Sequence, residues 1–182
     1  MTSPDAVAFT RHGPSDVSVL ADHLVELYRV VYAEPPYFER AADVLEFTRR
    51  LDRQVAEPGF ALVAGWSGQE LVGYVFGFTL TARSTVWETI LTSGGQLPAA
   101  GSAAGPAYVS ELLVRSNWRR QGVGRSLLDR FLADRGESHA ILLAHPDAAA
   151  AQAAYARWGW REIGWGRPFP HSPRYLTLLL AL

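Results

Sequence analysis

The sequence contains no cysteine, which excludes disulfides, thiolate metal sites and a covalent acyl-cysteine intermediate. It contains no lysine either, since all 17 of its basic residues are arginine. This absence excludes a Schiff-base lysine and the phosphate-binding lysine of a Walker motif. Any fixed positive charge at a functional site must therefore come from arginine.

The sequence also lacks an excess of charge of one sign and a long apolar run. Its formal net charge is -1, which favours neither a nucleic-acid partner nor an anionic membrane surface. The first residues lack the basic and apolar regions of a signal peptide, and no apolar stretch is long enough to span a bilayer. We therefore expect one soluble, cytoplasmic globular domain over residues 1–182.

The hydrophobic pattern predicts a succession of strands and helices. Apolar residues at every third or fourth position predict helices, and short runs rich in aliphatic and aromatic residues predict strands. The predicted strands are residues 6–10, 60–66, 71–80, 108–114, 141–144, 160–165 and 175–180, and the predicted helices are residues 17–31, 41–56, 126–135 and 147–158.

A long connection, residues 81–106, separates two of the predicted strands. It contains a short predicted helix at residues 84–91, with Trp87 on its apolar side, and ends in a segment rich in glycine and alanine. Loops of this length often carry function.

The most informative segment is RRQGVGR at residues 119–125, between a predicted strand and a predicted helix. Its two glycines allow the backbone to approach an anion, and the following helix offers unpaired N–H groups and the positive end of its dipole. We interpret the segment as a pyrophosphate-binding turn. It lacks the G-x-G-x-x-G spacing of a dinucleotide-binding Rossmann enzyme.

A second motif is AQAAYARWGW at residues 151–160, an alanine-rich helix that carries Tyr155 and leads through Gly159 into an aromatic residue. Together with the glycine turn and the order of elements, it resembles the Gcn5-related N-acetyltransferase (GNAT) superfamily over nearly the whole chain. Arg119, Gly122 and Gly124 stand at the signature positions of that family's acetyl-CoA segment.

The resemblance implies an α/β (α+β) fold with a central mixed, mostly antiparallel sheet of about six or seven strands and about four flanking helices. The chain departs from the family in three places. Ser116 stands where members commonly have proline, and the asparagine that often begins the second-motif helix is absent, which leaves one pantetheine contact unassigned. The connection at residues 81–106 is longer than the hairpin of many members, so the acceptor side is expected to be individual.

The implied cofactor is acetyl-CoA, with no metal. The backbone N–H groups of residues 121–126 would bind its pyrophosphate, and residues 112–114 would pair with pantetheine as an added peptide strand does. An N–H near Leu113 or Val114 can polarise the thioester carbonyl. The arginines of the turn are expected to meet phosphates, the alternative being a solvated charged face. The predicted cofactor-binding residues are Leu112, Leu113, Val114, Arg119, Arg120, Gln121, Gly122, Val123, Gly124, Arg125 and Ser126.

Two residues are predicted to be catalytic. The resemblance places Tyr155 near the CoA sulfur as general acid, and the alternative is an aromatic residue that anchors its helix. Glu111 is the predicted general base, acting directly or through water, because an ideal strand would place it on one face with Val109 and Leu113. An exposed sheet edge is the alternative for Glu111, and His145 and His171 are the other candidate bases.

The acceptor site is expected at the break between the first two helices and at the loop before the last strand. Aromatic walls with an acidic residue suit a cationic amine on an apolar body, whereas ordinary loop packing is the alternative. The predicted substrate-binding residues are Glu34, Tyr37, Phe38, Trp87 and His171.

We therefore expect an acetyl-CoA-dependent N-acetyltransferase that acts directly on a primary amine of a small molecule, by a sequential mechanism. A protein lysine or N-terminus as acceptor, and a non-catalytic acyl-CoA sensor, are the alternatives. GNAT proteins are often dimers, so a homodimer is possible, with the apolar residues 176–182 at its interface or in the core.

Overall fold

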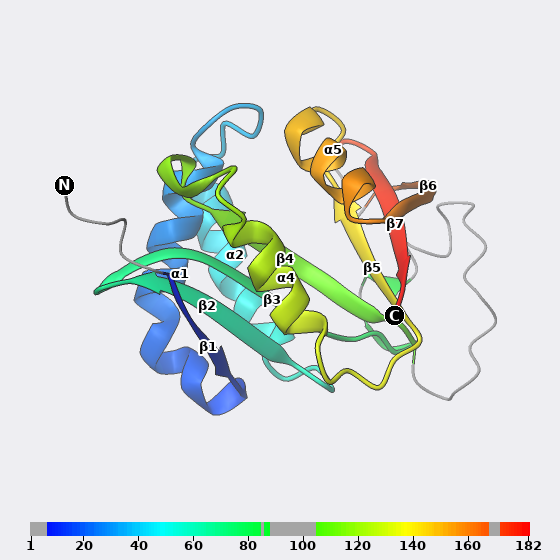
Figure 1. The fold of residues 1–182 in the computed structure, drawn as a ribbon, viewed down its shortest axis with the longest axis horizontal. Helices are drawn as coiled ribbons and strands as arrows, with labels where there is room; N and C mark the ends of the chain where they lie inside the picture. The colour runs from blue at the N-terminus through cyan, green and yellow to red at the C-terminus, as the bar shows by residue number, and fades with distance from the viewer. Residues whose placement is uncertain (1–6, 85, 88–104, 168–171) are drawn as a thin grey trace. The chain divides into compact units, whose positions relative to one another are not determined.

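A computed structural model describes residues 7–84, 86–87, 105–167 and 172–182. Seven strands form one mixed sheet in the order β1-β2-β3-β4-β5-β7-β6, and four α-helices within these ranges flank it (Figure 1). The predicted fold class is thereby confirmed. The chain divides into two compact units, of which the first is Met1–Gly77 with Glu111–Ala133 and the second is Phe78–Ser110 with Asp134–Leu182.

The first unit is built on antiparallel strands. Val63 pairs with Arg11 on one side and with Val75 on the other, and the predicted hairpin closes with Ser67 opposite Glu70. Its strands are β1 (Ala8–His12), β2 (Ala61–Ser67), β3 (Glu70–Thr79) up to Gly77, and the end of β4 (Ala107–Val114).

The close approach of β3 and β4 in this unit requires a glycine. A Cβ on Gly73 would lie 2.7 Å from the Leu113 carbonyl oxygen, and Arg115 N donates to Val72 O at 2.9 Å nearby. Because real Cβ atoms do not come this close to backbone, any larger residue would push the strands apart.

Three helices cover the strands of the first unit. In Figure 1, α4 (Val123–Leu132) lies in front of the strands, and α1 (Val17–Tyr32) and α2 (Ala41–Gln54) lie behind them. The predicted apolar side of α4 is buried at Val123, Leu127, Leu128 and Phe131.

The bounds of α4 differ from the prediction of residues 126–135. The helix begins at Val123, because Gly122 supplies a left-handed N-cap that starts the helix inside the glycine turn. It ends at Leu132, two residues before Asp134, whose φ of 62° is incompatible with helix.

The second unit contains β5 (His139–Ala144), α5 (Ala149–Arg157), β6 (Arg161–Gly166) and β7 (Tyr175–Ala181). β5 pairs with the start of β4 in parallel and with β7 antiparallel, and β7 pairs antiparallel with β6. The buried side chains of these strands include Ile141, Leu178 and Leu179.

The long connection contributes little to the described fold. The predicted helix at residues 84–91 lies largely outside the described residues. In the described part, Ser84 N donates to Thr81 O at 3.0 Å and Trp87 N donates to Ser84 O at 2.9 Å. None of the helices in the described ranges has the length and apolar character needed to cross a membrane.

Candidate active site

The turn that leads from β4 into α4 has a left-handed backbone at two residues. After the 3-10 helix Ser116–Trp118, Arg120 has φ 62° and Gly122 has φ 83°. Ser126 N donates to Gly122 O at 2.9 Å. The N–H groups of Val123 and Gly124 precede this bond and therefore have no acceptor within the helix.

The space around this turn suits an anion. A Cβ on Gly122 would meet no atom within 4 Å, so the backbone is open on that side. The N-terminus of α4, with the positive end of the helix dipole, lies at the same turn. The residues present therefore fit the pyrophosphate group of a CoA-type ligand.

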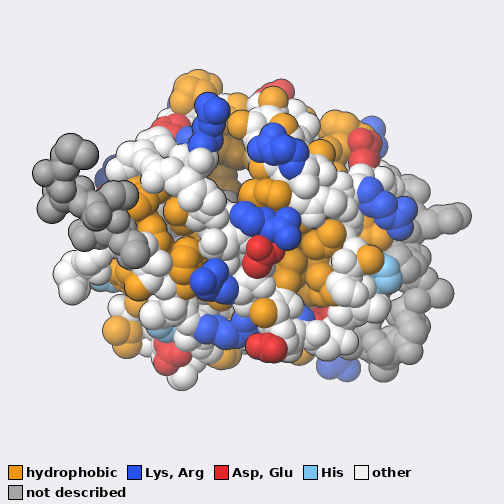
Figure 2. All heavy atoms as spheres, in the orientation of Figure 1, with side chains coloured by type: hydrophobic (Ala, Val, Ile, Leu, Met, Phe, Trp, Pro, Cys, Tyr) orange, Lys and Arg blue, Asp and Glu red, His pale blue; other side chains and the backbone are white. Residues whose placement is uncertain are grey.

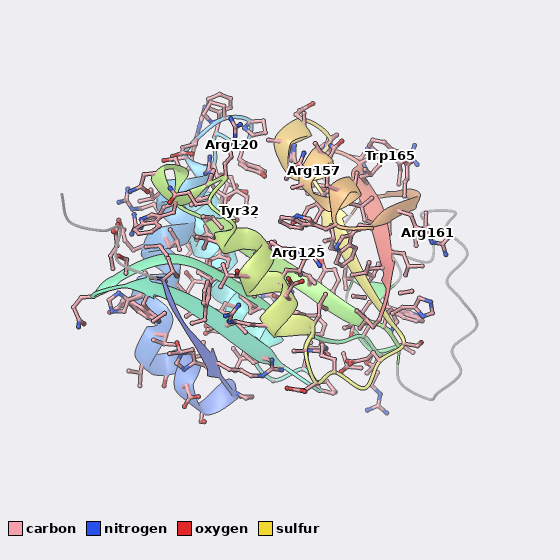
Figure 3. The ribbon with its side chains drawn as sticks, in the orientation of Figure 1. Tyr32, Arg120, Arg125, Arg157, Arg161 and Trp165 are labelled. Atoms are coloured by element: carbon pink, nitrogen blue, oxygen red, sulfur yellow. The ribbon has the colours of Figure 1, made fainter. Side chains whose placement is uncertain are left out.

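The three predicted arginines differ in their surroundings. Arg119 donates from Nε to Val114 O at 3.0 Å and forms an ion pair with Glu34 at 2.8 Å. Arg125 pairs with Asp129 at 2.8 Å on α4, where Figure 2 shows basic and acidic side chains next to one another. Arg120, at the turn in Figure 3, is exposed and has no side-chain partner within the described residues. Arg120 can thus meet a phosphate without losing an ion pair.

The other predicted cofactor residues follow the same strand and helix. On β4, Leu113 is buried, and Leu112 and Val114 are partly exposed. The parallel ladder with β5 covers Ala107, Tyr108 and Val109, so residues 112–114 lie beyond it. Gln121 is exposed and donates from Nε2 to Asn117 O at 2.8 Å.

Glu111 lies in the buried row of β4 with Val109 and Leu113, as the strand pattern predicts, and is 5% exposed. Both of its carboxylate oxygens have donors. Tyr32 donates its hydroxyl to Oε2 at 2.7 Å, and Arg50 donates from Nη2 to Oε1 at 2.5 Å. Tyr32 comes from the last turn of α1 (Figure 3) and Arg50 comes from α2, so three elements hold this carboxylate.

The pKa of the Tyr32 hydroxyl is raised well above its usual 10.0. Burial is the larger cause, followed by the negative charge of Glu111. Tyr32 therefore keeps its proton at neutral pH and donates it to the carboxylate.

The predicted acceptor residues of the helix break lie beside this group. The Tyr37 ring meets the Tyr32 ring edge-on at 4.5 Å, and Glu34 holds Arg119 by the ion pair. Phe38, in contrast, is 65% exposed and has φ 53°. The structure thus brings Glu34 and Tyr37 to the candidate base and the glycine turn, and leaves Phe38 at the surface.

Sequence patterns did not single out four residues of this group, which are Tyr28, Tyr32, Glu39 and Arg50. Tyr28 stacks on Phe47 at 3.8 Å and lies 4.3 Å from the Tyr32 ring. It also interacts electrostatically with Glu39, whose pKa is raised, chiefly by burial. Tyr28 and Tyr32 are four residues apart on one helix face, which is a usable signal, but nothing in the sequence separates Arg50 from its neighbouring arginines.

Tyr155 belongs to the second unit. It is half-buried on α5, and its ring meets Trp158 at 5.7 Å and Trp160 at 5.9 Å, both edge-on. The two indoles fix the ring by packing, and this is compatible with either predicted role.

The structure says less about the roles of the remaining predicted residues, His145, Trp87 and His171. Burial lowers the pKa of His145, and Asp147 N donates to its Nδ1 at 3.2 Å, so the lone pair of the neutral ring is already engaged. Trp87 is half-buried next to Gly105. His171 lies outside the described residues. Among the residues described, no group of three or more His, Asp and Glu could hold a metal ion.

Comparison with known proteins places the chain in one family. The sequence model of the Acetyltransferase (GNAT) family matches residues 20–160. A search of curated proteins gave no match.

Solved structures resemble the chain over 97% of its length. An acetyltransferase from Thermus thermophilus is 20% identical, with 97% of that chain covered and a TM-score of 0.58. PaiA N-acetyltransferase from Thermoplasma acidophilum, solved with coenzyme A, is 10% identical, with 99% covered and a TM-score of 0.61. NAA60 from Arabidopsis thaliana, solved with acetyl-CoA, is 16% identical, with 100% covered and a TM-score of 0.65.

Proposed function

Since the chain belongs to the GNAT family of acetyltransferases, we propose that it transfers the acetyl group of acetyl-CoA directly to a primary amine of a small molecule, by a sequential mechanism. One observation carries the proposal. Strand β4 bears the buried Glu111 and leads within the same unit into the open glycine turn at Gly122. The proposed base and the proposed anion site thus lie on one continuous segment. The lack of cysteine in the sequence supports direct attack over a cysteinyl intermediate.

Acetyl-CoA, when bound, supplies a thioester carbonyl carbon that an amine can attack. The N–H groups of residues 121–126 bind the pyrophosphate, and Arg120 adds charge to this site from its exposed position. Arg119 and Arg125 bind phosphate by giving up their ion pairs with Glu34 and Asp129. The backbone of residues 112–114 holds the pantetheine chain, and an N–H of this segment polarises the carbonyl.

The chain's own residues move the protons. Glu111 receives the proton of the amine, directly or through an intervening group, and Tyr155 donates its hydroxyl proton to the leaving sulfur. Glu34, Tyr37 and Phe38 bind the amine from the helix break, and Trp87 and His171 belong to the same proposed set of substrate-binding residues. Aromatic rings beside carboxylates attract a cation, which supports an amine acceptor.

A free-thiol release assay with acetyl-CoA and a panel of amines tests the proposal. We expect thiol release with small primary amines, and a loss of about 100-fold in kcat for Tyr155→Phe, because a positioned proton donor contributes at least this factor. Tyr108→Phe, which alters a buried tyrosine on the start of β4, serves as the matched control and should retain activity.

Three results would contradict the proposal. Tight CoA binding without transfer to any amine would favour a non-catalytic sensor, and transfer to peptides alone would favour a protein acceptor. A Tyr155→Phe variant with unchanged turnover at saturating acetyl-CoA would remove the tyrosine from the mechanism.

A further inference from the structure

The carboxylate of Glu111 is too enclosed for an amine to contact it directly, so a proton must reach it through another residue. Its side chain is 4% exposed, and each of its oxygens already accepts a hydrogen bond, one from Arg50 and one from Tyr32. The Arg50 side chain is also mostly buried, with 17% of its surface exposed. An amine that approached Glu111 directly would have to displace one of these donors.

Tyr32 is placed to be the intermediary. Its hydroxyl gives its one proton to Glu111, and its oxygen keeps lone pairs that can accept a proton from elsewhere. The Tyr32 residue is half-buried, whereas Tyr28 and Glu111 are buried. Its ring contacts Tyr37 at 4.5 Å, on the side of the proposed acceptor residues.

A second carboxylate belongs to this cluster. Glu39 is held next to Tyr32, because its backbone N–H donates to Tyr32 O at 2.8 Å, and its side-chain Oε2 is buried with no hydrogen-bond partner within the described residues. Glu39 interacts electrostatically with both Glu111 and Arg50. When both carboxylates are ionised, the single guanidinium of Arg50 leaves one negative charge in excess.

The cluster can therefore hold one additional proton. Protonating either carboxylate leaves one carboxylate to balance Arg50 and removes the excess charge from a buried place. The neighbouring charges do not cancel this excess, because Asp43 adds negative charge and Arg119 is paired with Glu34. The titratable and charged groups around the pair, from every element packed on it, are Tyr28, Tyr32, Tyr37, Asp43, Arg50, Tyr74 and Arg119.

We propose that the Tyr32 hydroxyl contacts the acceptor amine and relays the amine's proton to the carboxylate pair of Glu111 and Glu39, which Arg50 leaves one negative charge in excess. This inference rests on the proposed function. The amine binds as an ammonium ion, and one of its protons moves to Tyr32 Oη while the Tyr32 proton moves to Glu111 Oε2. The free amine then attacks the thioester carbon, so that the C–N bond forms and the C–S bond breaks. The thiolate takes a proton from Tyr155, and the second proton that leaves the nitrogen restores the Tyr155 hydroxyl. Tyr32 is then a catalytic residue, and Arg50 and Glu39 are positioning residues.

The test compares Tyr32→Phe with Tyr74→Phe. Tyr74 is also buried in the first unit and feels the charges of Glu111 and Arg50, but its hydroxyl donates to the Leu24 carbonyl at 3.3 Å and not to a carboxylate. We expect Tyr32→Phe to lower kcat/KM about 100-fold at neutral pH, and the loss to shrink as the pH approaches the amine's own pKa, about 10.4 for a lysine-like amine. Amine affinity in the presence of CoA, measured by calorimetry, should change less than about twofold, and Tyr74→Phe should match the wild type.

Two outcomes overturn the relay. Unchanged kcat/KM in Tyr32→Phe removes the tyrosine from proton transfer, and a loss that is the same at every pH and accompanied by lost amine affinity makes its role structural. If Tyr32→Phe fails to fold, Glu39→Gln is the second variant, because a relay to the Glu111 and Glu39 pair predicts a lower kcat/KM at neutral pH that recovers as the pH rises, whereas a Glu111 that acts without Glu39 predicts an unchanged kcat/KM. A wild-type protein that binds CoA and acetylates no amine contradicts the proposed function and the relay together, whereas wild-type transfer with either outcome above contradicts the relay alone.

Discussion

Arg50 and Arg53 lie on the same helix, but their different burial makes their expected contributions to stability different. Arg50 pairs with Glu111, whose side chain is 4% exposed, while Arg53 pairs with Glu46 at 3.0 Å, where the two side chains are 60% and 53% exposed. Burial removes the solvent screening that makes surface ion pairs weak, and it makes an unpaired charge costly.

We expect Arg50→Met to lower the free energy of unfolding by about 3–5 kcal/mol, because it leaves the Glu111 carboxylate buried without its cation. Arg53→Met is the control and should cost less than about 1 kcal/mol. Urea unfolding of both variants measures the difference. Equal losses in the two variants would show that the Arg50 pair is worth no more than a surface pair.

At the scale of elements, the connection from β4 to α4 combines two constraints. β4 alternates so that Glu111 is buried and Leu112 is partly exposed, and the left-handed Gly122 then starts α4 with its N-terminus at the open turn. The alternation places the carboxylate, and the glycine places the helix N–H groups.

Gly122→Ala should weaken CoA binding through the backbone alone. A Cβ there would meet no atom within 4 Å, but alanine at φ 83° costs about 1–2 kcal/mol, which the turn can relieve by changing shape. We expect roughly tenfold weaker CoA binding by calorimetry, since about 1.4 kcal/mol corresponds to that factor. Gly136→Ala, at a glycine with equally open surroundings and no left-handed backbone, should bind CoA like the wild type. Unchanged binding in Gly122→Ala would mean that the turn's conformation does not matter to the ligand.

At the scale of the whole molecule, the carboxyl of the half-buried Glu39 affects how stability depends on pH. Burial raises its pKa above the ordinary 4.5, so between 4.5 and the raised value the folded chain binds more protons than the unfolded chain. The contribution of Glu39 to the free energy of unfolding therefore falls as the pH rises through this window.

Glu39→Gln should remove that contribution. We expect the stability of the variant relative to the wild type to increase as the pH rises from about 4.5, and to level off above the folded-state pKa of Glu39. Thermal or urea unfolding of both proteins across this range measures the difference. A constant difference at all pH values would mean that Glu39 titrates alike in the folded and unfolded chains.

Much of the fold could be read from the sequence. The seven strands, the four helices and the hairpin at residues 67–70 follow from apolar spacing and turn residues, which act over short distances. The start of α4 was predicted three residues late, because a left-handed glycine N-cap has no strong sequence signature distinct from an ordinary turn. The buried face of Glu111 followed from strand alternation, but its partners Tyr32 and Arg50 are 79 and 61 residues away in the chain.

The sequence by itself determined the family, the element order and the glycine turn, because each is a local pattern of residue types along the chain. Only the tertiary structure decided which charges meet. It assigned Arg119 to Glu34, Arg50 to Glu111, and left Arg120 exposed at the turn. The physical reason is that hydrophobic spacing specifies which face of an element is buried, whereas an ion pair depends on how distant elements pack. The arginines all carry the same charge, so only their positions in the folded chain decide which carboxylate each one meets.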